Sequence, residues 1–419
     1  MKTIYFGFLA MILPTLSLAQ NTVFQDSIPE IQLEEVKLAG LRIDQDQPFS
    51  FSNLDKEELA SRNLGQDLPI MLNYLPGVVT TSDAGAGIGY TGIRVRGSDA
   101  TRVNVTINGI PYNDSESQGV YWVNMPDFTS SVSSLQIQRG VGTSTNGSGA
   151  FGASINLLTD EVSQNAYAEI ANTVGSFNSL KHTLKFSTGL LNNHFEVSGR
   201  LSKITSDGYV ERASSNLKSY FLQAAFQDEN TLIKALVFGG HEITYQSWFG
   251  VDKNTLDTNR QYNPAGEIYD YNGNLEGNYD NQVDNYRQDH YQLHWNQKID
   301  AYTSLSLGLN YTYGRGYYEE YKDLWFEQNV NFSSDNNFNY LGLNPIKIGG
   351  TIIDTTENIV RKWLDNDYYV ATFSLNRQKG NTEWSLGILY SRYVGDHFGE
   401  LIFANYAPGV SPRHRFYEN

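Results

Sequence analysis

The chain has 419 residues, with 46 acidic and 30 basic side chains and therefore a formal net charge of −16. This acidic balance argues against a nucleic-acid-binding protein, which needs clustered Lys and Arg on its surface. The lack of cysteine excludes disulfide frameworks, thiolate metal sites and cysteine nucleophiles. After the first 20 residues no apolar run approaches the ~18 residues of a membrane-spanning helix, so any membrane-embedded part is expected to consist of strands.

The N-terminus has the composition of a secretory signal peptide. Lys2 supplies a positive charge, Ile4–Leu13 is apolar, and the small residues Ser17 and Ala19 precede Gln20. A basic, an apolar and a small-residue region in this order are typical of an exported protein. We expect residues 1–19 to be a signal peptide that is removed after Ala19.

Residues 20–48 are polar, and we expect them to form a flexible arm. Within this arm, Ile31–Leu38 is the one strand-like stretch. An extended, exposed stretch can add a strand to the sheet of a partner protein through main-chain hydrogen bonds. The alternative is that it forms the first strand of the domain that follows.

Residues 49–160 are predicted to form a compact α+β domain. Acidic residues at 55–58 favour a helix start, and Leu68, Leu72 and Leu75 recur at helical spacing before a Pro-Gly pair that ends the helix. These leucines are expected in the core. Short strands punctuated by glycine are predicted after the helix, at 92–97, 102–107, 132–138 and 154–158.

From residue 161 to the end, segments of about ten residues alternate strictly between apolar and polar side chains. In one segment Leu305, Leu307 and Leu309 lie on one face, while Ser306 and Gly308 lie on the other. This period of two predicts strands with one polar face and one apolar face. Nine such strands are predicted, at 166–174, 179–188, 194–205, 217–227, 231–243, 289–300, 303–314, 367–378 and 382–394.

Short and long connections alternate between these strands. After a short first connection at 175–178, tight turns at 189–193, 228–230, 301–302 and 379–381 alternate with loops at 206–216, 245–288 and 315–366. Transmembrane barrels sort their connections in this way, with the long loops outside the cell. A water-soluble β-sandwich also has alternating strands, but it has no reason to sort its loops. The sequence therefore favours antiparallel transmembrane β-barrel strands after the α+β domain.

Five short motifs follow one another between residues 75 and 159. They are LPGV at 75–78, IRVRG at 93–97, VTINGIPYND at 105–114, QRG at 138–140 and NGSGAFGASINLLT at 146–159. Together they resemble the plug domain of TonB-dependent outer-membrane receptors, and SKITSDGY at 202–209 and TYQSWFG at 244–250 resemble the barrel of bacteroidete-type members. Two departures are mild: Asn108 replaces the family's usual Asp before the Gly, and LQI at 135–137 replaces a commoner IEV.

The resemblance implies a plug domain that fills a barrel of about 22 strands in the cell outer membrane. It implies a receptor and transporter rather than an enzyme, without a cofactor or a resident metal. Such receptors import a scarce nutrient when TonB pulls on the arm. The TonB-binding box is therefore expected within the strand-like stretch of the arm, at Leu33, Glu34, Glu35, Val36 and Lys37.

The favoured cargo is a ferric chelate of the siderophore or ferric citrate type, because no long N-terminal accessory domain precedes the plug. Two alternatives stay open. The same fold could import an oligosaccharide, a peptide or cobalamin, and a secreted β adhesin would have no transport function at all.

Two groups of site residues follow from the resemblance. Arginines that match the family's plug-to-barrel contacts are Arg94, Arg96 and Arg139, for which ordinary solvated side chains are the alternative. Residues expected to bind the ligand are Tyr90, Tyr112, Asn113, Tyr121 and Trp122 in the plug and Tyr245 and Trp248 in the barrel. Aromatic rings offer large rigid surfaces with a polar edge, but the barrel pair could instead belong to an interfacial girdle.

The strand count conflicts with a complete barrel. Nine strands are fewer than half of about 22, and an odd number does not fit a bacterial single-chain barrel. Residues 416–419 fall where an outer loop is expected. An open sheet in lipid leaves two edges of unpaired backbone groups. We therefore expect a truncated chain or a split gene product that does not form a working channel alone.

Overall fold

In the computed structural model, residues 42, 49–141, 151–326, 337–407, 409–411 and 413–419 are described. The expected signal peptide (1–19), nearly all of the arm (20–48) and the predicted TonB-binding residues Leu33, Glu34, Glu35, Val36 and Lys37 lie outside these ranges. Within them, no helix combines the length and the apolar character that crossing a membrane requires.

Elements β1 to β7 form a small N-terminal domain around a five-stranded sheet of order β1-β6-β7-β4-β5. The pairs in this sheet are antiparallel except β4 with β7, which is parallel. The elements of this domain are β1 (Phe51–Asp55), α1 (Lys56–Arg62), α2 (Leu68–Met71), β2 (Val78–Ser82), β3 (Thr91–Val95), η1 (Ala100–Arg102), β4 (Val103–Ile107), β5 (Ile110–Pro111), η2 (Trp122–Asn124), η3 (Phe128–Ser131), β6 (Val132–Arg139) and β7 (Ala153–Thr159). The predicted strands and the α+β class of this domain are confirmed.

The helix predicted before the Pro-Gly pair is wrong in its continuity, because two short helices replace it. Asp55 caps α1, and its side chain accepts a hydrogen bond from the Glu58 N–H at 2.9 Å. The chain then leaves the helical path, and Gly65 adopts a φ of 120°, which other residues rarely adopt. The second helix, α2, starts only after Asp67.

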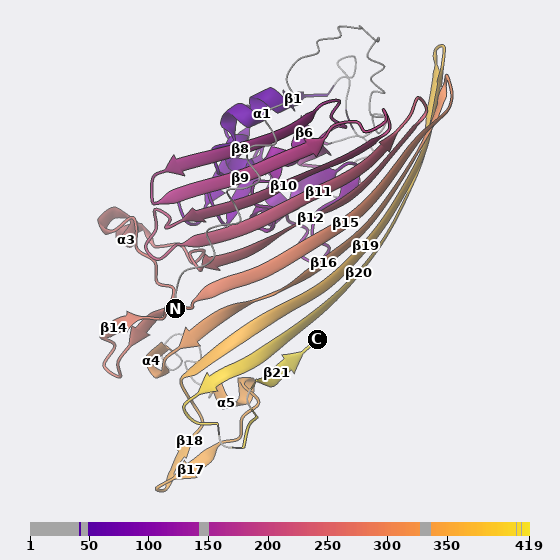
Figure 1. The fold of residues 1–419 in the computed structure, drawn as a ribbon. Coiled ribbons are helices and arrows are strands. Elements are labelled where there is room, and N and C mark those ends of the chain that lie inside the picture. Colours follow the sequence, from indigo (N-terminus) through magenta and orange to yellow (C-terminus); the bar gives the residue numbers. More distant parts are fainter. Residues whose placement is uncertain (1–41, 43–48, 142–150, 327–336, 408, 412) are drawn as a thin grey trace, which may run out of the picture. The chain divides into compact units, whose positions relative to one another are not determined.

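Ten strands form the second sheet, here called the wall (Figure 1). Its order is β21-β20-β19-β16-β15-β12-β11-β10-β9-β8, and every pair is antiparallel. The strands are β8 (Ala166–Gly175), β9 (Ser179–Thr188), β10 (Phe195–Ser206), β11 (Ser215–Gln227), β12 (Thr231–Tyr245), β15 (Val283–Asp300), β16 (Thr303–Lys322), β19 (Asn358–Lys379), β20 (Thr382–Ala404) and β21 (His414–Glu418). All nine predicted strands are present.

The wall differs from the prediction in two respects. The later strands extend further than expected, since β19 and β20 have 22 and 23 residues. In addition, the residues assigned to an outer loop near 416–419 mostly belong to β21, which pairs with β20.

The long connections of the wall leave the strands at one end, which we call the loop end. The short first connection at 176–178 is also at this end, and the other short turns lie at the opposite end. Small elements lie in the long connections. They are α3 (Lys253–Thr258), β13 (Glu267–Tyr269), β14 (Leu275–Asn278), α4 (Leu324–Phe326), α5 (Asn337–Tyr340), β17 (Ile346–Ile348) and β18 (Thr351–Ile353). This arrangement agrees with the sorting of loops that the sequence predicts.

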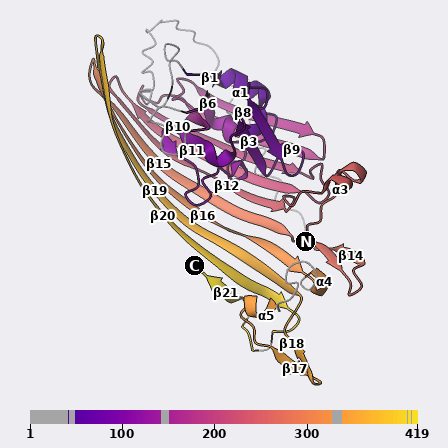
Figure 2. The same cartoon turned by 180° about the vertical axis from the view of Figure 1, so that it is seen from behind.

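The N-terminal domain lies against one face of the wall (Figure 2). Leu68, Leu72 and Leu75 are buried in its core, as predicted, and this core continues into the wall. Phe128 of the N-terminal domain meets Phe221 and Phe238 of the wall, with ring centroids 6.4 and 5.2 Å apart. An apolar contact therefore joins the two parts.

One buried carboxylate, Asp127, holds the N-terminal domain to the wall. Its Oδ1 lies 2.6 Å from Lys181 Nζ and its Oδ2 lies 3.3 Å from Arg200 Nη1. The hydroxyls of Thr183 and Ser202, also on the wall, donate hydrogen bonds to Oδ2. Burial alone would raise the pKa of Asp127, but Arg200 and Lys181 outweigh burial and hold the pKa well below its usual range.

The segment next to Asp127 approaches the wall so closely that β12 needs a glycine. A Cβ at Gly240 would lie 2.4 Å from the carbonyl oxygen of Asn124 and 2.7 Å from Pro126 Cδ. Ser219 Oγ also donates to the Pro126 carbonyl oxygen at 2.6 Å. Residues 124–127 therefore pack tightly against β11 and β12.

A second carboxylate of the N-terminal domain, Asp160, also forms an ion pair with a cation of the wall. Its Oδ2 lies 3.1 Å from Lys185 Nζ of the wall and its Oδ1 lies 2.9 Å from Lys56 Nζ of α1. Lys234 Nζ donates to the Asp160 carbonyl oxygen at 3.1 Å. The ion pairs between the two parts thus join carboxylates of the N-terminal domain to cations of the wall.

For Arg94, Arg96 and Arg139 the sequence predicts the opposite placement of charges, with cations on the N-terminal domain and carboxylates on the wall. Arg96 Nη1 donates to the Arg139 carbonyl oxygen, and the Arg139 guanidinium donates to Ser50, Phe51 and Ser52 of the same domain. Arg94 is exposed on β3. Among the described contacts, those of Arg96 and Arg139 stay within the N-terminal domain.

Replacing Asp127 by Asn should weaken the seating of the N-terminal domain. The amide still accepts hydrogen bonds, but Lys181 and Arg200 remain buried without a counter-charge, which costs about 3–5 kcal/mol. We expect the free energy of unfolding, measured by urea denaturation in detergent, to fall by that order. The matched control is Asp257→Asn, which breaks the exposed pair with Lys253 and should have little effect. Equal losses in both variants would contradict the assignment.

A second prediction concerns Asp67, which is 4 % exposed and accepts a hydrogen bond from Thr91 Oγ1 at 3.0 Å. Burial raises the pKa of Asp67 to about 8. The folded chain therefore keeps this proton where the unfolded chain loses it, and the Asp67 contribution to stability falls as the pH rises from about 4 to about 8.

Asp67→Asn keeps the acceptor for Thr91 but removes the titration. Relative to the unmodified chain, the variant should gain thermal stability as the pH is raised from 5 to 8.5, and each unit of pKa shift corresponds to about 1.4 kcal/mol. Asp99→Asn, at an exposed position of the same domain, should show no such gain. A pH-independent difference for Asp67→Asn would show that the carboxyl group is ionised in the fold.

Candidate functional site

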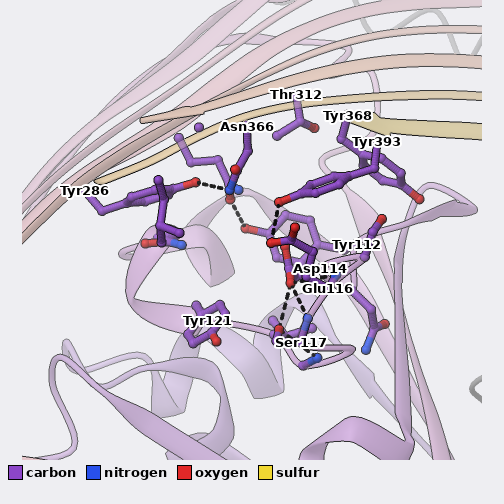
Figure 3. A pocket seen from close by; sticks show the side chains of 18 of the residues that line it. Tyr112, Asp114, Glu116, Ser117, Tyr121, Tyr286, Thr312, Asn366, Tyr368 and Tyr393 are labelled. Atoms are coloured by element: carbon purple, nitrogen blue, oxygen red, sulfur yellow. Dashed lines mark hydrogen bonds between the residues drawn. The ribbon is translucent and has the colours of Figure 1, made fainter. Parts of the chain in front are cut away.

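A cavity of about 540 Å³ lies between the N-terminal domain and the wall. The segment 110–121 and Tyr90 line one side, and strands β12, β15, β16, β19 and β20 line the other. Figure 3 shows Tyr112, Glu116 and Tyr121 on the side of the N-terminal domain and Tyr286 and Tyr393 on the side of the wall. Cavities of a few hundred Å³ with convergent polar groups are typical of small-molecule sites.

Polar side chains fix the conformation of the loop at 112–118. Asn113 Nδ2 donates to the carbonyl oxygens of Val103 and Gln118, both at 2.9 Å, and its Oδ1 accepts from the Val105 N–H at 2.7 Å. Asp114 Oδ1 accepts from the N–H groups two and three residues further on. Asn113 therefore lines the cavity mainly as a brace for the loop.

Tyr90 connects the N-terminal domain to the wall at the edge of the cavity. Its hydroxyl donates to Asp284 and lies 3.4 Å from Glu242 Oε1, and its ring meets Trp248 edge-on at 5.3 Å. Burial and then the charges of Glu242 and Asp284 raise the pKa of Tyr90 well above its usual value. The phenol therefore keeps its proton and remains a hydrogen-bond donor.

Tyr112 makes a second connection deeper in the cavity. Its hydroxyl donates to Gln288 Oε1 at 2.9 Å, and its ring centroid lies 5.2 Å from that of His290. Burial raises the pKa of Tyr112 well above its usual value, so that this phenol is also protonated.

Glu116 completes the contacts across the cavity. Its Oε2 accepts from the Tyr393 hydroxyl at 3.3 Å and lies 3.0 Å from His397 Nε2, both on β20. A ligand that enters between these groups would touch the N-terminal domain and the wall together.

Two kinds of side chain dominate the lining. The carboxylates are Asp114, Glu116, Glu242 and Asp284. The phenols are Tyr90, Tyr112, Tyr121, Tyr286, Tyr317, Tyr318, Tyr368 and Tyr393. The cavity therefore combines aromatic surface with acidic and other hydrogen-bonding side chains.

The structure places the residues that the sequence assigned to ligand binding in three locations. Tyr90, Tyr112, Asn113, Tyr121 and Trp248 line the cavity. Trp122 is buried in the core of the N-terminal domain at 4 % exposure, because it starts the short helix η2 that packs inward. Tyr245 is buried elsewhere, and its hydroxyl donates to the carbonyl oxygens of Ala265 and Tyr279 at 3.1 and 2.8 Å.

Sequence reasoning missed the phenols of the wall, including Tyr286, Tyr368 and Tyr393. They lie on β15, β19 and β20, at positions of the alternation that face the N-terminal domain. An aromatic residue in the otherwise polar phase of a predicted wall strand would have been the signal for them.

A family model and known structures match this arrangement. The model described as TonB-dependent Receptor Plug Domain matches residues 44–154. No curated protein matches the chain.

Three solved structures illustrate the similarity of fold. BauA, the ferric preacinetobactin receptor from Acinetobacter baumannii, has a TM-score of 0.62 and 12 % identity over 89 % of this chain and 53 % of that one. The unliganded ferric citrate transporter FecA has a TM-score of 0.59 and 15 % identity over 88 % of this chain and 50 % of that one. The copper transporter OprC has a TM-score of 0.56 and 12 % identity over 84 % of this chain and 46 % of that one.

At these identities the similarity concerns the fold, and the chain spans about half the length of each of these structures. The plug family is one of receptors and transporters in the outer membrane, which is not an enzyme class. The location of the chain is accordingly the cell outer membrane. The N-terminal domain is a TonB-dependent receptor plug domain, and the wall that follows it has the fold of such a receptor's barrel.

Proposed function

We propose that the chain acts in a TonB-dependent receptor that binds a ferric chelate of the siderophore type in the cavity between the N-terminal domain and the wall. TonB would supply the energy for import by pulling on the arm. The names of BauA and FecA support iron-chelate cargo, whereas that of OprC shows that the fold serves another metal as well.

The observation that carries this proposal is the pair of contacts that Tyr90 and Tyr112 make across the cavity. Tyr90 donates to Asp284 and Tyr112 donates to Gln288, so that the lining is shared between a plug domain and its wall. A ligand that replaces or strengthens these contacts changes the interaction between the two parts. Binding and release of the plug would therefore be coupled through the same side chains.

The charges of the cavity narrow the class of ligand. Four acidic side chains and eight phenols line it, and no lysine or arginine is among the described residues of its lining. Opposite charges attract and like charges repel across a partly desolvated cavity. We therefore propose a chelate that is neutral or cationic, such as a ferric trihydroxamate, in preference to an anionic complex of the ferric citrate or tricatecholate type.

Ligand binding to the purified chain in detergent tests this assignment. Quenching of tryptophan fluorescence would be titrated with a neutral and a cationic ferric trihydroxamate, with ferric citrate and with a ferric tricatecholate. We expect the trihydroxamates to bind at least about tenfold more tightly than the two anions. Tighter binding of either anion would refute the charge argument, and binding of an oligosaccharide without any chelate would favour the alternative cargo.

Trp248→Ala should weaken chelate binding by about tenfold, because Trp248 offers the cavity an aromatic face that is 37 % exposed. The matched control is Trp384→Ala, since Trp384 is similarly exposed, at 43 %, but does not line the cavity. Circular dichroism would establish that both variants are folded. Equal affinities in the two variants would exclude the cavity as the binding site.

The proposed TonB contact is tested separately. A peptide covering residues 30–40 should bind the periplasmic domain of TonB by strand addition, and the Val36→Pro peptide should not, because proline removes a main-chain donor. Val36→Ile keeps both the donor and the branched side chain and should bind like the original. Equal binding by the proline peptide would place the TonB contact elsewhere.

A further inference from the structure

The outward face of the wall carries a cationic row that the proposed transport function does not use. Along β9, Lys181, Thr183 and Lys185 are buried, whereas His182 and Leu184 point to the outer side and are exposed. Directly opposite residues of neighbouring strands share a face, so each outward position belongs to a row that crosses the wall.

One outward row is apolar. Ile170 of β8 pairs with Leu184 of β9, which pairs with Leu201 of β10, which pairs with Tyr220 of β11. The first three side chains are 73 %, 40 % and 57 % exposed. Exposed aliphatic side chains on this face are suited to contact with lipid acyl chains.

The next outward row toward the loop end is basic over six consecutive strands. The directly opposite residues are His182, Lys203, Lys218, His241, Arg287 and Arg315, on β9, β10, β11, β12, β15 and β16. The row continues to acidic residues, because Arg315 is opposite Asp365 and Asp365 is opposite Asp396. The basic part of this row therefore extends from β9 to β16, in a chain whose net charge is −16.

Most members of this row already have partners. Arg287 Nε lies 2.8 Å from Asp289 Oδ2, and Arg315 Nη1 lies 2.8 Å from Asp365 Oδ2. His182 Nδ1 is 2.6 Å from Asn172 Oδ1, and His241 Nε2 is 2.9 Å from Asn285 Oδ1.

Lys203 and Lys218 differ from these residues. Each side chain is exposed, the two residues are directly opposite one another, and neither ammonium group makes an ion pair or hydrogen bond with any residue in the described part of the chain. Like charges at directly opposite positions of an antiparallel pair repel each other and destabilise the pairing. An anion between the two ammonium groups would remove this repulsion.

A hollow of about 620 Å³ lies at this position. Its lining includes Lys203 and Lys218 from the basic row and Ile170, Leu184 and Leu201 from the apolar row. The four strands concerned, β8 to β11, lie side by side (Figure 1). A cationic edge and an apolar surface therefore meet in one depression, with the cations nearer the loop end.

We propose that this hollow binds the phosphate-bearing head group of a membrane lipid. Lys203 and Lys218 would hold the phosphate, and an acyl chain would lie along Leu184, Leu201 and Ile170. Lysine ammonium groups next to an apolar surface interact favourably with anionic head groups. The position also fits the outer membrane location, since the row lies on the face turned away from the plug domain.

The test uses the whole chain in a neutral detergent and lipid A, a glycolipid with two phosphates, as the probe. Lipid A should bind, and the double variant Lys203→Gln with Lys218→Gln should bind at least about tenfold more weakly. The variant with Arg at both positions should keep the affinity. Lys298→Gln with Lys379→Gln, which removes two charges at the turn end of the wall, should leave binding unchanged. Equal affinity of the Gln variant at 203 and 218 would overturn the proposal.

Two further binding measurements identify the source of the anion. Dephosphorylated lipid A should bind weakly if the phosphate is recognised, and equal binding would overturn the proposal. Inorganic phosphate at millimolar concentration should not displace lipid A, because it lacks the acyl contact. Complete displacement would show a site for free anions instead of a lipid.

A measurement on the unsubstituted chain guards against a variant that fails to fold. Lys203 and Lys218 would be acetylated by a water-soluble reagent, with and without lipid A, and the modified lysines quantified by mass spectrometry. Lipid A should slow modification of these two residues and not that of Lys298 and Lys379. Equal protection of all four residues, or none, would overturn the proposal.

Discussion

The association of the two parts of this chain depends on a buried carboxylate in contact with buried cations. Asp127 is inaccessible to water, and without Lys181 and Arg200 its charge would be too costly to bury. The same contact fixes the neighbouring backbone against Gly240 of β12. The ion pairs of Asp127 are polar and directional, whereas the adjoining contact through Phe128 is apolar. Together they fix the position of residues 124–127 on the wall and stabilise the contact. The same contact borders the cavity, because Asn124 lines the cavity and its carbonyl oxygen lies against Gly240.

Much of the fold could be predicted from the sequence, because strict alternation of apolar and polar residues over ten positions matches the period of a strand and not that of a helix. The alternation located all nine long strands of the wall. It failed at their outer ends, where charged and aromatic residues share a face, as Arg361 and Trp363 do on β19. It also failed for β21, since five residues at His414–Glu418 are too short for a period to be visible. The break between α1 and α2 was missed because the acidic start at 55–58 and the helical spacing of Leu68, Leu72 and Leu75 were assigned to one helix, although Gly65 lies between them.

The cavity was less predictable than the fold. Tyr112 and Asn113 lie within one motif, so a local pattern was sufficient to locate them. The phenols of the wall come from strands separated by up to about a hundred residues, and only the register of the sheet brings them together. The polarity of the ion pairs was missed for a related reason. Lys181 and Arg200 appear in the sequence as ordinary polar members of an alternating strand, and nothing local shows that each faces Asp127.

The position of β1 has a mechanical consequence. This strand is at the edge of the five-stranded sheet, and among the described strands it pairs there with β6 alone. Before it in the chain, the Arg42 side chain donates hydrogen bonds to Ser134 of β6 and Asn156 of β7. A load transmitted along the backbone from residue 50 therefore reaches the Phe51–Gln138 pair first and can peel β1 away while β6, β7 and β4 stay paired. Partial unravelling of the N-terminal domain would thus begin at β1 and not at the ion pairs of Asp127 with the wall, and it would need less force than extracting the folded domain in one piece.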